Sequence, residues 1–126
     1  MPVPVVPSVM HQDLMANKKL EDPYLRLNEL KAQWVNDKTW QYRHEFQSPQ
    51  VPAGATVVLV FDGLDTFATV ALDGEKILES SNMFLGYRVN IIKALTSKES
   101  HVLDIKFDCA KSKAREIRGQ HPLYGR

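Results

Sequence analysis

Cysteine is almost absent from this chain of 126 residues, which has a single one, Cys109. One cysteine cannot form an intramolecular disulfide, so nothing in the sequence indicates an oxidising compartment. An excess of charge of one sign is also missing, because 16 Lys and Arg residues face 15 Asp and Glu residues, for a net charge of +1. Proteins that bind nucleic acid usually carry a clear basic excess, so we expect no nucleic-acid partner.

Long apolar runs are missing as well. The longest, over residues 57–61, is far shorter than the roughly 20 residues that span a bilayer, so we expect no membrane partner. The N-terminal segment 1–10 lacks a basic start, and prolines interrupt it where a signal peptide would need an apolar helix. Together with the single cysteine, this predicts a cytoplasmic location.

Motifs for cofactors, metals and nucleophiles are not found either. The six glycines are spread singly, without a GxGxxG or GxxxxGK loop, so no nucleotide cofactor is indicated. The cysteine has no CxxC partner, and no two histidines have the i, i+4 spacing that would hold a metal. Structural or solvent-facing roles are therefore predicted for the histidines, His11, His44, His101 and His121. We expect no cofactor and no metal.

From residue 40 onward the apolar residues follow the period of β-strands. Trp40, Tyr42 and Phe46 alternate with polar residues, and a period of two recurs further along the chain. Strands are predicted over residues 40–46, 56–61, 67–72, 75–78, 87–91 and 103–108. Short turns join them, with brief helical segments over 92–98 and 111–119. The pattern predicts an all-β fold, an antiparallel β-sandwich.

Two local features make this prediction specific. Asp73-Gly74 lies between two predicted strands, and a type I′ hairpin turn needs positive φ at both central residues, which this pair tolerates. Residues 56–61 form a continuous, largely β-branched run, TVVLVF, which predicts a strand covered on both faces. We therefore expect one tight hairpin and one enclosed strand within the sandwich.

The beginning of the chain is predicted to be an irregular arm, with an extended lead followed by short helical turns. Leu27, Leu30 and Trp34 have the i, i+3, i+7 spacing of one helix face, which predicts a short amphipathic helix over 28–35. The predicted organisation is therefore an arm over 1–39 and a sandwich over 40–126, which together form one domain.

Carboxylates and aromatic residues offer a few further candidates. Asp22 precedes Pro23 and Glu29 lies near Trp34, but such turn and helix positions favour capping and surface roles over acid–base chemistry. Trp34 and Trp40 could form a sugar-binding platform, although aromatic residues of a small sandwich usually belong to the core. The basic residues Lys111, Lys113, Arg115, Arg118 and Arg126 fit a solvated helix face.

Several segments, taken together, are specific enough to indicate a family. They are VPSVMHQDL (6–14), DPY (22–24), NE (28–29), QW (33–34), WQYR (40–43), FDGLDTFATV (61–70), DG (73–74), NMF (82–84) and Arg88. In this order they resemble the start of the β-mannosidases of glycoside hydrolase family 2, and most closely the intracellular fungal type. The resemblance extends over nearly the whole chain.

The resemblance implies a fold, a role and a set of candidate residues. In that family the matching segment is an N-terminal jelly-roll domain similar to galactose-binding modules. The two catalytic glutamates of these retaining enzymes lie in a later barrel domain, so the chain alone is expected to be inactive. Its expected role is to pack on the barrel and shape the sugar pocket, with Asp22, Asn28, Glu29 and Asn82 at a carbohydrate cleft. A structural role of Asn28 and Glu29 within the arm is the alternative.

The sequence also departs from the family pattern. It ends before the Trp-Asp-Trp-Gly segment that, in the family, follows the region resembled by residues 121–124. It shows about six strands where a jelly roll usually has about eight. We therefore expect a fragment whose unpaired strand edges favour self-association and marginal stability. A monomer that unfolds sharply above about 65 °C would contradict this expectation.

Two other functions stay open at this point. A stand-alone carbohydrate-binding module would bind a mannoside glycan without any barrel, and calorimetry with mannose, mannobiose and galactose would detect it. An inert product would show neither binding nor activity. In each case we expect this chain alone not to hydrolyse p-nitrophenyl β-mannoside.

Overall fold

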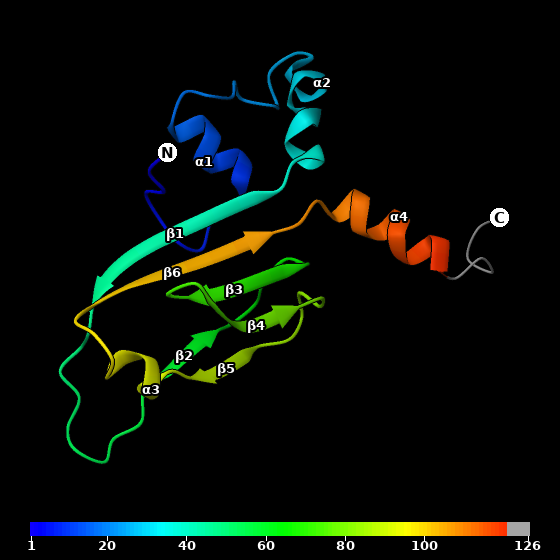
Figure 1. Cartoon of the computed structure of the whole chain (residues 1–126). Coiled ribbons are helices and arrows are strands. Elements are labelled where there is room, and N and C mark those ends of the chain that lie inside the picture. Colours follow the sequence, from blue (N-terminus) through cyan, green and yellow to red (C-terminus); the bar gives the residue numbers. More distant parts are fainter. Residues whose placement is uncertain (121–126) are drawn as a thin grey trace. The chain divides into compact units, whose positions relative to one another are not determined.

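The structure is a computed structural model, and it describes residues 1–120 (Figure 1). The predictions that involve His121, Arg126, the segment 121–124 and the end of the sandwich lie outside the described residues. The chain divides into two compact units, of which the first covers Met1–Lys38 and the second begins at Thr39. We call the first unit the arm and the second the sandwich.

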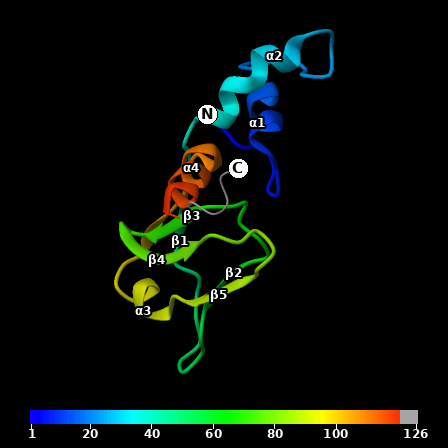
Figure 2. The same ribbon diagram turned by 90° about the vertical axis from the view of Figure 1, so that its right-hand side faces the viewer.

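In the described residues, the sandwich contains two antiparallel sheets. Their strands are β1 (Trp40–Gln47), β2 (Val58–Phe61), β3 (Ala68–Leu72), β4 (Glu75–Ser80), β5 (Tyr87–Asn90) and β6 (Ser100–Phe107). The larger sheet has the order β1-β6-β3-β4, and the smaller one pairs β2 with β5. Figures 1 and 2 show β2 and β5 lying below β3 and β4 as a second layer. The predicted antiparallel β-sandwich is confirmed.

Two apolar clusters hold the two sheets together. In the first, Ala68 and Val70 of β3 are buried and pack against Phe61 and Tyr87 of the smaller sheet. In the second, Leu72 of β3 packs with residues that lie in or next to strands of both sheets and in the helix over residues 92–95. These residues are Phe46, Val57, Leu59, Ile77, Val89, Ile91, Ala94 and Leu95. Strand β3 thus supplies the centre of the core, since its inward residues take part in both clusters.

The hairpin between β3 and β4 has the predicted turn. Asp73 and Gly74 both have positive φ, of 56° and 86°, as a type I′ turn requires. The main-chain N–H of Asp73 also donates a hydrogen bond of 2.8 Å to the carbonyl oxygen of Val102 on β6. The turn is therefore fixed both by its own backbone and by the neighbouring strand.

The expectation that residues 56–61 form a strand covered on both faces is wrong. The side chains of Val58 and Val60 are 41% and 48% exposed, whereas Leu59 and Phe61 point into the core. In a sandwich of two layers each sheet has one face against the other sheet, and residues 1–120 place no third layer over the outer face of β2. The apolar run is not evidence of double burial, because β-branched residues also favour strands that are half exposed.

Up to residue 120, two helices accompany the strands of the sandwich. The short helix α3 (Ile92–Leu95) contributes the buried Leu95 to the core, and α4 (Ala110–Gln120) has no buried residue. Both lie where short helical segments were predicted. Within residues 1–120, no helix is long and apolar enough to cross a membrane.

The arm contains α1 (Met10–Ala16), α2 (Asn28–Ala32) and the 3₁₀ helix η1 (Gln33–Asp37). A helix was predicted at the right place, but with the wrong buried face. Leu27 and Leu30 are 67% and 63% exposed, and the arm buries Ala32 and Val35 instead. At Gln33 the chain changes to three residues per turn, which breaks the 3.6-residue stripe that the prediction assumed.

Candidate functional site

A groove on the arm contains two of the four predicted carbohydrate residues. Its volume is about 810 Å³, and it is lined by Glu21, Asp22, Leu25, Arg26, Leu27, Asn28 and Lys31. Asp22 and Asn28 thus share one concave surface. Glu29 lies on α2 outside this lining, and Asn82 belongs to the sandwich. Within the arm, the groove thus brings together Asp22 and Asn28 of the predicted set.

The groove is shaped by hydrogen bonds that its own polar residues make. One carboxylate oxygen of Asp22 accepts a bond of 2.9 Å from the main-chain N–H of Tyr24. The carbonyl oxygen of Asp22 accepts bonds from the N–H of Leu25, at 3.2 Å, and from the side-chain amide of Asn28, at 3.1 Å. Such an Asx turn is what Asp before Pro favours. Asp22 and Asn28 thus define the shape of the arm, and contact with sugar stays a prediction.

The rim of the groove carries both signs of charge. Lys31 pairs with Glu21 at 3.3 Å, and both side chains are more than 70% exposed, at 72% and 71%. An exposed pair of this kind contributes little to stability. With Arg26 and Asp22 added, two basic and two acidic residues line the groove. Its electrostatics therefore favour neither a purely anionic nor a purely cationic ligand.

Asn82 shapes the loop between β4 and β5. Its side-chain oxygen accepts a bond of 2.9 Å from the N–H of Phe84, and its carbonyl oxygen accepts a bond of 3.4 Å from the hydroxyl of Tyr87. The hydroxyl of Ser80 donates to the Tyr87 oxygen at 3.0 Å. The loop is thereby held in a defined shape, with Phe84 at its tip 85% exposed.

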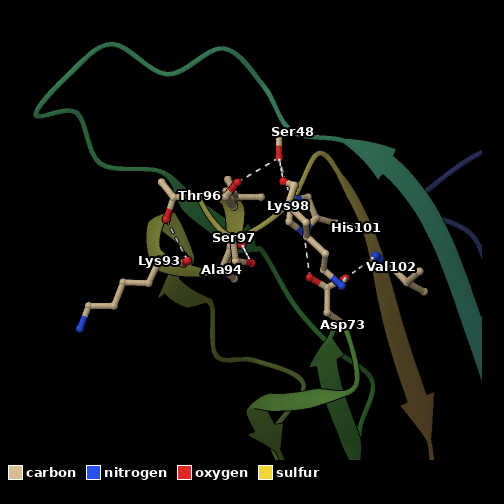
Figure 3. A network of polar contacts seen from close by, with 10 residues as sticks. Ser48, Asp73, Lys93, Ala94, Thr96, Ser97, Lys98, His101 and Val102 are labelled. Carbon is tan, nitrogen blue, oxygen red and sulfur yellow. Dashed lines mark hydrogen bonds and ion pairs between the residues drawn. The ribbon is translucent and has the colours of Figure 1, made fainter.

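The structure reveals a polar cluster that the sequence reasoning missed (Figure 3). The hydroxyl oxygen of Ser48 lies 2.7 Å from Nε2 of His101, and Nδ1 of His101 lies 2.7 Å from a carboxylate oxygen of Asp73. These are the contacts of a Ser-His-Asp triad, in which the carboxylate orients the imidazole and the imidazole activates the hydroxyl. These two contacts have the geometry of a nucleophilic serine site, and the surroundings of Ser48 decide whether the hydroxyl can act as a nucleophile.

The surroundings of Ser48 are unsuitable for nucleophilic catalysis. Its hydroxyl oxygen lies 2.8 Å from the carbonyl oxygen of Lys98 and 3.1 Å from that of Leu95. An oxyanion needs N–H donors around it, and two carbonyl oxygens would repel the charge that develops in acyl transfer. The side chain of His101 is also completely buried. We conclude that the cluster is a structural clamp.

Asp73 is the anionic centre of this clamp. Its carboxylate accepts hydrogen bonds from the N–H of Val102 at 2.9 Å and from Lys98 at 3.1 Å, in addition to the contact with His101. Burial tends to raise the pKa of Asp73, but the hydrogen bonds from His101, Val102 and Lys98 outweigh it and lower the pKa to about 2. Asp73 is therefore ionised at neutral pH, and Nδ1 of His101 must carry a proton.

One signal in the sequence could have located His101. It lies two, four and six residues before Leu103, Ile105 and Phe107, which were predicted to face the core, so the same alternation places His101 inside. No comparable signal marks Ser48, which follows the last residue of β1. The contact between Ser48 and His101 joins positions that are distant in the sequence, and only the fold shows it.

Among residues 1–120, no three His, Cys, Asp or Glu side chains are grouped in a way that could hold a metal ion. Cys109 is half-buried, and its sulfur accepts a hydrogen bond of 3.4 Å from the hydroxyl of Ser112.

The fold and these clusters define the class of the chain as an antiparallel β-sandwich domain that carries a helical arm. Residues 1–126 match the family model described as glycosyl hydrolase 2 galactose-binding domain-like, and the chain belongs to that family. The resemblance inferred from the sequence is thus confirmed.

Similar proteins are named β-mannosidases. Beta-mannosidase B of Emericella nidulans is 64% identical over 120 residues, which are 95% of this chain and 14% of that protein. Beta-mannosidase B of Aspergillus oryzae is 64% identical over 118 residues, 94% of this chain and 14% of that protein. The crystal structure of a β-D-mannosidase from Dictyoglomus thermophilum has a TM-score of 0.82 and 34% identity, and covers 93% of this chain and 14% of its own. This chain therefore spans about 14% of the length of these relatives.

Proposed function

We propose that this chain serves as the N-terminal, non-catalytic domain of a β-mannosidase, an enzyme that removes terminal β-D-mannose from the non-reducing ends of β-D-mannosides. The observation that carries the proposal is that nearly the whole chain recurs, in sequence and in fold, within proteins named β-mannosidases. The chain would correspond to a small part of such an enzyme and would leave the chemistry to another part.

The requirements of glycoside hydrolysis explain why we assign the chemical step to another part of the enzyme. A retaining glycosidase needs two carboxyl groups about 5 Å apart on either side of the scissile bond. The polar cluster around His101 instead contains a single carboxylate, that of Asp73, which the histidine holds. The proposed contribution of the chain is to pack on the catalytic barrel and shape the entrance of its sugar pocket.

A chimeric enzyme tests this proposal. In Beta-mannosidase B of Emericella nidulans, the matching segment would be replaced by this chain, and release of p-nitrophenol from p-nitrophenyl β-mannoside would be measured. We expect the chimera to retain activity and the 126-residue chain alone to show none above background. The same enzyme without the segment is the control. An inactive chimera, or turnover by a clean preparation of the chain alone, would contradict the proposal.

A second function, that of a stand-alone carbohydrate-binding module, is favoured by one observation. Tyr24 is 95% exposed and is separated by one residue from Asp22 in the groove, and sugar sites often use an exposed aromatic ring beside polar groups. Calorimetry with mannose, mannobiose and galactose tests it, with Tyr24→Ala as the matched variant. A heat of binding that is measured for the unchanged chain and lost in Tyr24→Ala would support the module. We expect no measurable heat of binding from either protein.

A further inference from the structure

The arm presents several exposed apolar side chains that lie close together in the sequence. Tyr24, Leu25, Leu27 and Leu30 are 95%, 60%, 67% and 63% exposed, and we call these four residues the arm ridge. They lie within a stretch of seven residues, and two of them, Leu25 and Leu27, line the groove. Single exposed leucines are ordinary on protein surfaces, but several together usually mark a binding surface.

The backbone that carries the ridge is ordered by polar contacts. Asp22 and Asn28 bridge the turn that precedes α2, and the ion pair between Glu21 and Lys31 joins the two ends of the stretch. Arg26, in the middle, has a φ of 54°, a left-handed conformation that a side chain other than glycine adopts only when its surroundings hold it there. The apolar side chains are thus held ready for contact, which lowers the entropy cost of binding.

The chemistry of the ridge fits a protein surface better than a sugar or a lipid. Three of its four residues are leucines, which lack the flat aromatic face on which a sugar ring stacks. The groove beside it carries two acidic and two basic residues, whereas helices that bind anionic membranes are rich in basic residues. An apolar centre with a mixed polar rim is the usual anatomy of a protein–protein interface.

We infer that the arm ridge docks on another domain of the same β-mannosidase polypeptide, an inference that rests on the proposed function. The relatives are much longer than this chain, which spans 14% of their length. A domain on the same polypeptide is present at an effective concentration of roughly millimolar, far above that of a second copy. It is therefore the favoured occupant of the ridge.

Trypsin cleavage provides a direct test, because Arg26 and Lys31 lie within or next to the ridge. We expect cleavage after these two residues to be about tenfold slower in the active chimera described above than in the 126-residue chain alone, because docking shields the arm. The double substitution Leu27→Ser and Leu30→Ser should restore fast cleavage in the chimera. Val58→Ser with Val60→Ser, on the exposed face of β2, is the matched control and should leave the protection unchanged.

A photo-crosslinking experiment identifies the occupant. A benzophenone side chain would replace Leu30 in the chimera, and in a control it would replace Lys93, whose side chain extends away from the clamp in Figure 3. We expect the probe at position 30 to form adducts with residues of the enzyme outside this chain. Adducts with a second copy, adducts within this chain only, or none at all in an active chimera would overturn the inference and leave the proposed function intact. An inactive chimera would overturn both.

Discussion

The sandwich and the arm bury their apolar side chains in different ways. In the sandwich, the alternation of each strand sends one set of residues inward, and Val70 and Leu72 are almost fully buried. In the arm, the helices are short, and they bury Leu14, Ala32 and Val35 while leaving Leu27 and Leu30 exposed. The comparison indicates that a sheet can complete a core from its own strands, whereas short helices depend on what they pack against.

The polar contacts of the two units also differ in how far they are exposed to water. In the sandwich, the completely buried side chain of His101 contacts Asp73, so loss of this partner would leave a buried imidazole nitrogen unsatisfied. In the arm, the pair Glu21 and Lys31 is exposed, and water can replace either partner at little cost. Substitutions in the sandwich should therefore affect global stability, and those in the arm should act locally.

The largest effect is expected from a cavity in the core of the sandwich. Leu72→Ala should lower the free energy of unfolding by about 2–5 kcal/mol, because the side chain is only 2% exposed and its removal leaves a cavity in the core. Chemical denaturation followed by circular dichroism measures the change. The control is Val60→Ala on the open face of β2, for which we expect a loss of about 0.5 kcal/mol or less. Equal losses of unfolding free energy in the two variants would contradict the assignment of Leu72 to the core and of Val60 to an open face.

Breaking the clamp should have the next largest effect. His101→Gln should lower the free energy of unfolding by about 1–3 kcal/mol, since the new side chain cannot reach both Asp73 and Ser48. In a double-mutant cycle with Ser48→Ala, we expect a coupling energy of about 0.5 kcal/mol or more. The control is His44→Gln at an exposed position of β1, which should be nearly neutral. Additive effects would show that Ser48 and His101 do not act together.

The clamp should also leave a signature in acid. The pKa of Asp73 is about 2 in the folded chain, below its ordinary value of 3.8, so its ionised form stabilises the fold. This contribution is complete above about pH 4 and is lost as the pH falls through about 2. Unfolding measured between pH 5 and pH 2 should show a steeper loss for the natural chain than for Asp73→Asn. Parallel curves for the two proteins would contradict the assignment.

The smallest effect is expected in the arm. Asn28→Ala removes the hydrogen bond to the carbonyl oxygen of Asp22 and should cost about 0.5–1.5 kcal/mol. We expect faster hydrogen exchange at the amides of residues 24–32 and no change in the strands of the sandwich. Lys19→Ala, at an exposed position of the arm, serves as the control. A destabilisation that reaches β3 and β6 would show that the two units unfold together.

Much of the sandwich could be predicted because its information is local. Period-two alternation located the strands, and Asp73-Gly74 located the hairpin, since both depend on residues that are close in sequence. The exposed face of β2 was not predicted, because whether a strand is covered on one side or two depends on how many layers pack against its sheet. The predicted buried face of α2 was also wrong. The prediction assumed one helical period over residues 28–35, but the 3₁₀ helix η1 follows α2 directly and changes that period.

The candidate site was predictable to a lesser degree. Asp22 and Asn28 do line one groove, and the Asp-Pro pair predicts the turn between them. The position of Asp22 could be inferred from its neighbours, but the groove itself could not, because it depends on how the turn folds against α2. The role of Asp73 was recognised only in the hairpin, and its second role, as the anion of the clamp, requires β6 to lie beside the turn.

The sequence by itself determined the β-sandwich class, the hairpin and the family, because alternation, turn chemistry and ordered motifs are properties of neighbouring residues. Only the tertiary structure decided which faces are covered, and it alone assembled Ser48, Asp73 and His101 from distant parts of the chain. It also left the leucines of the arm exposed. The physical reason is that burial and hydrogen bonding between distant residues depend on how the elements pack, which no local pattern encodes.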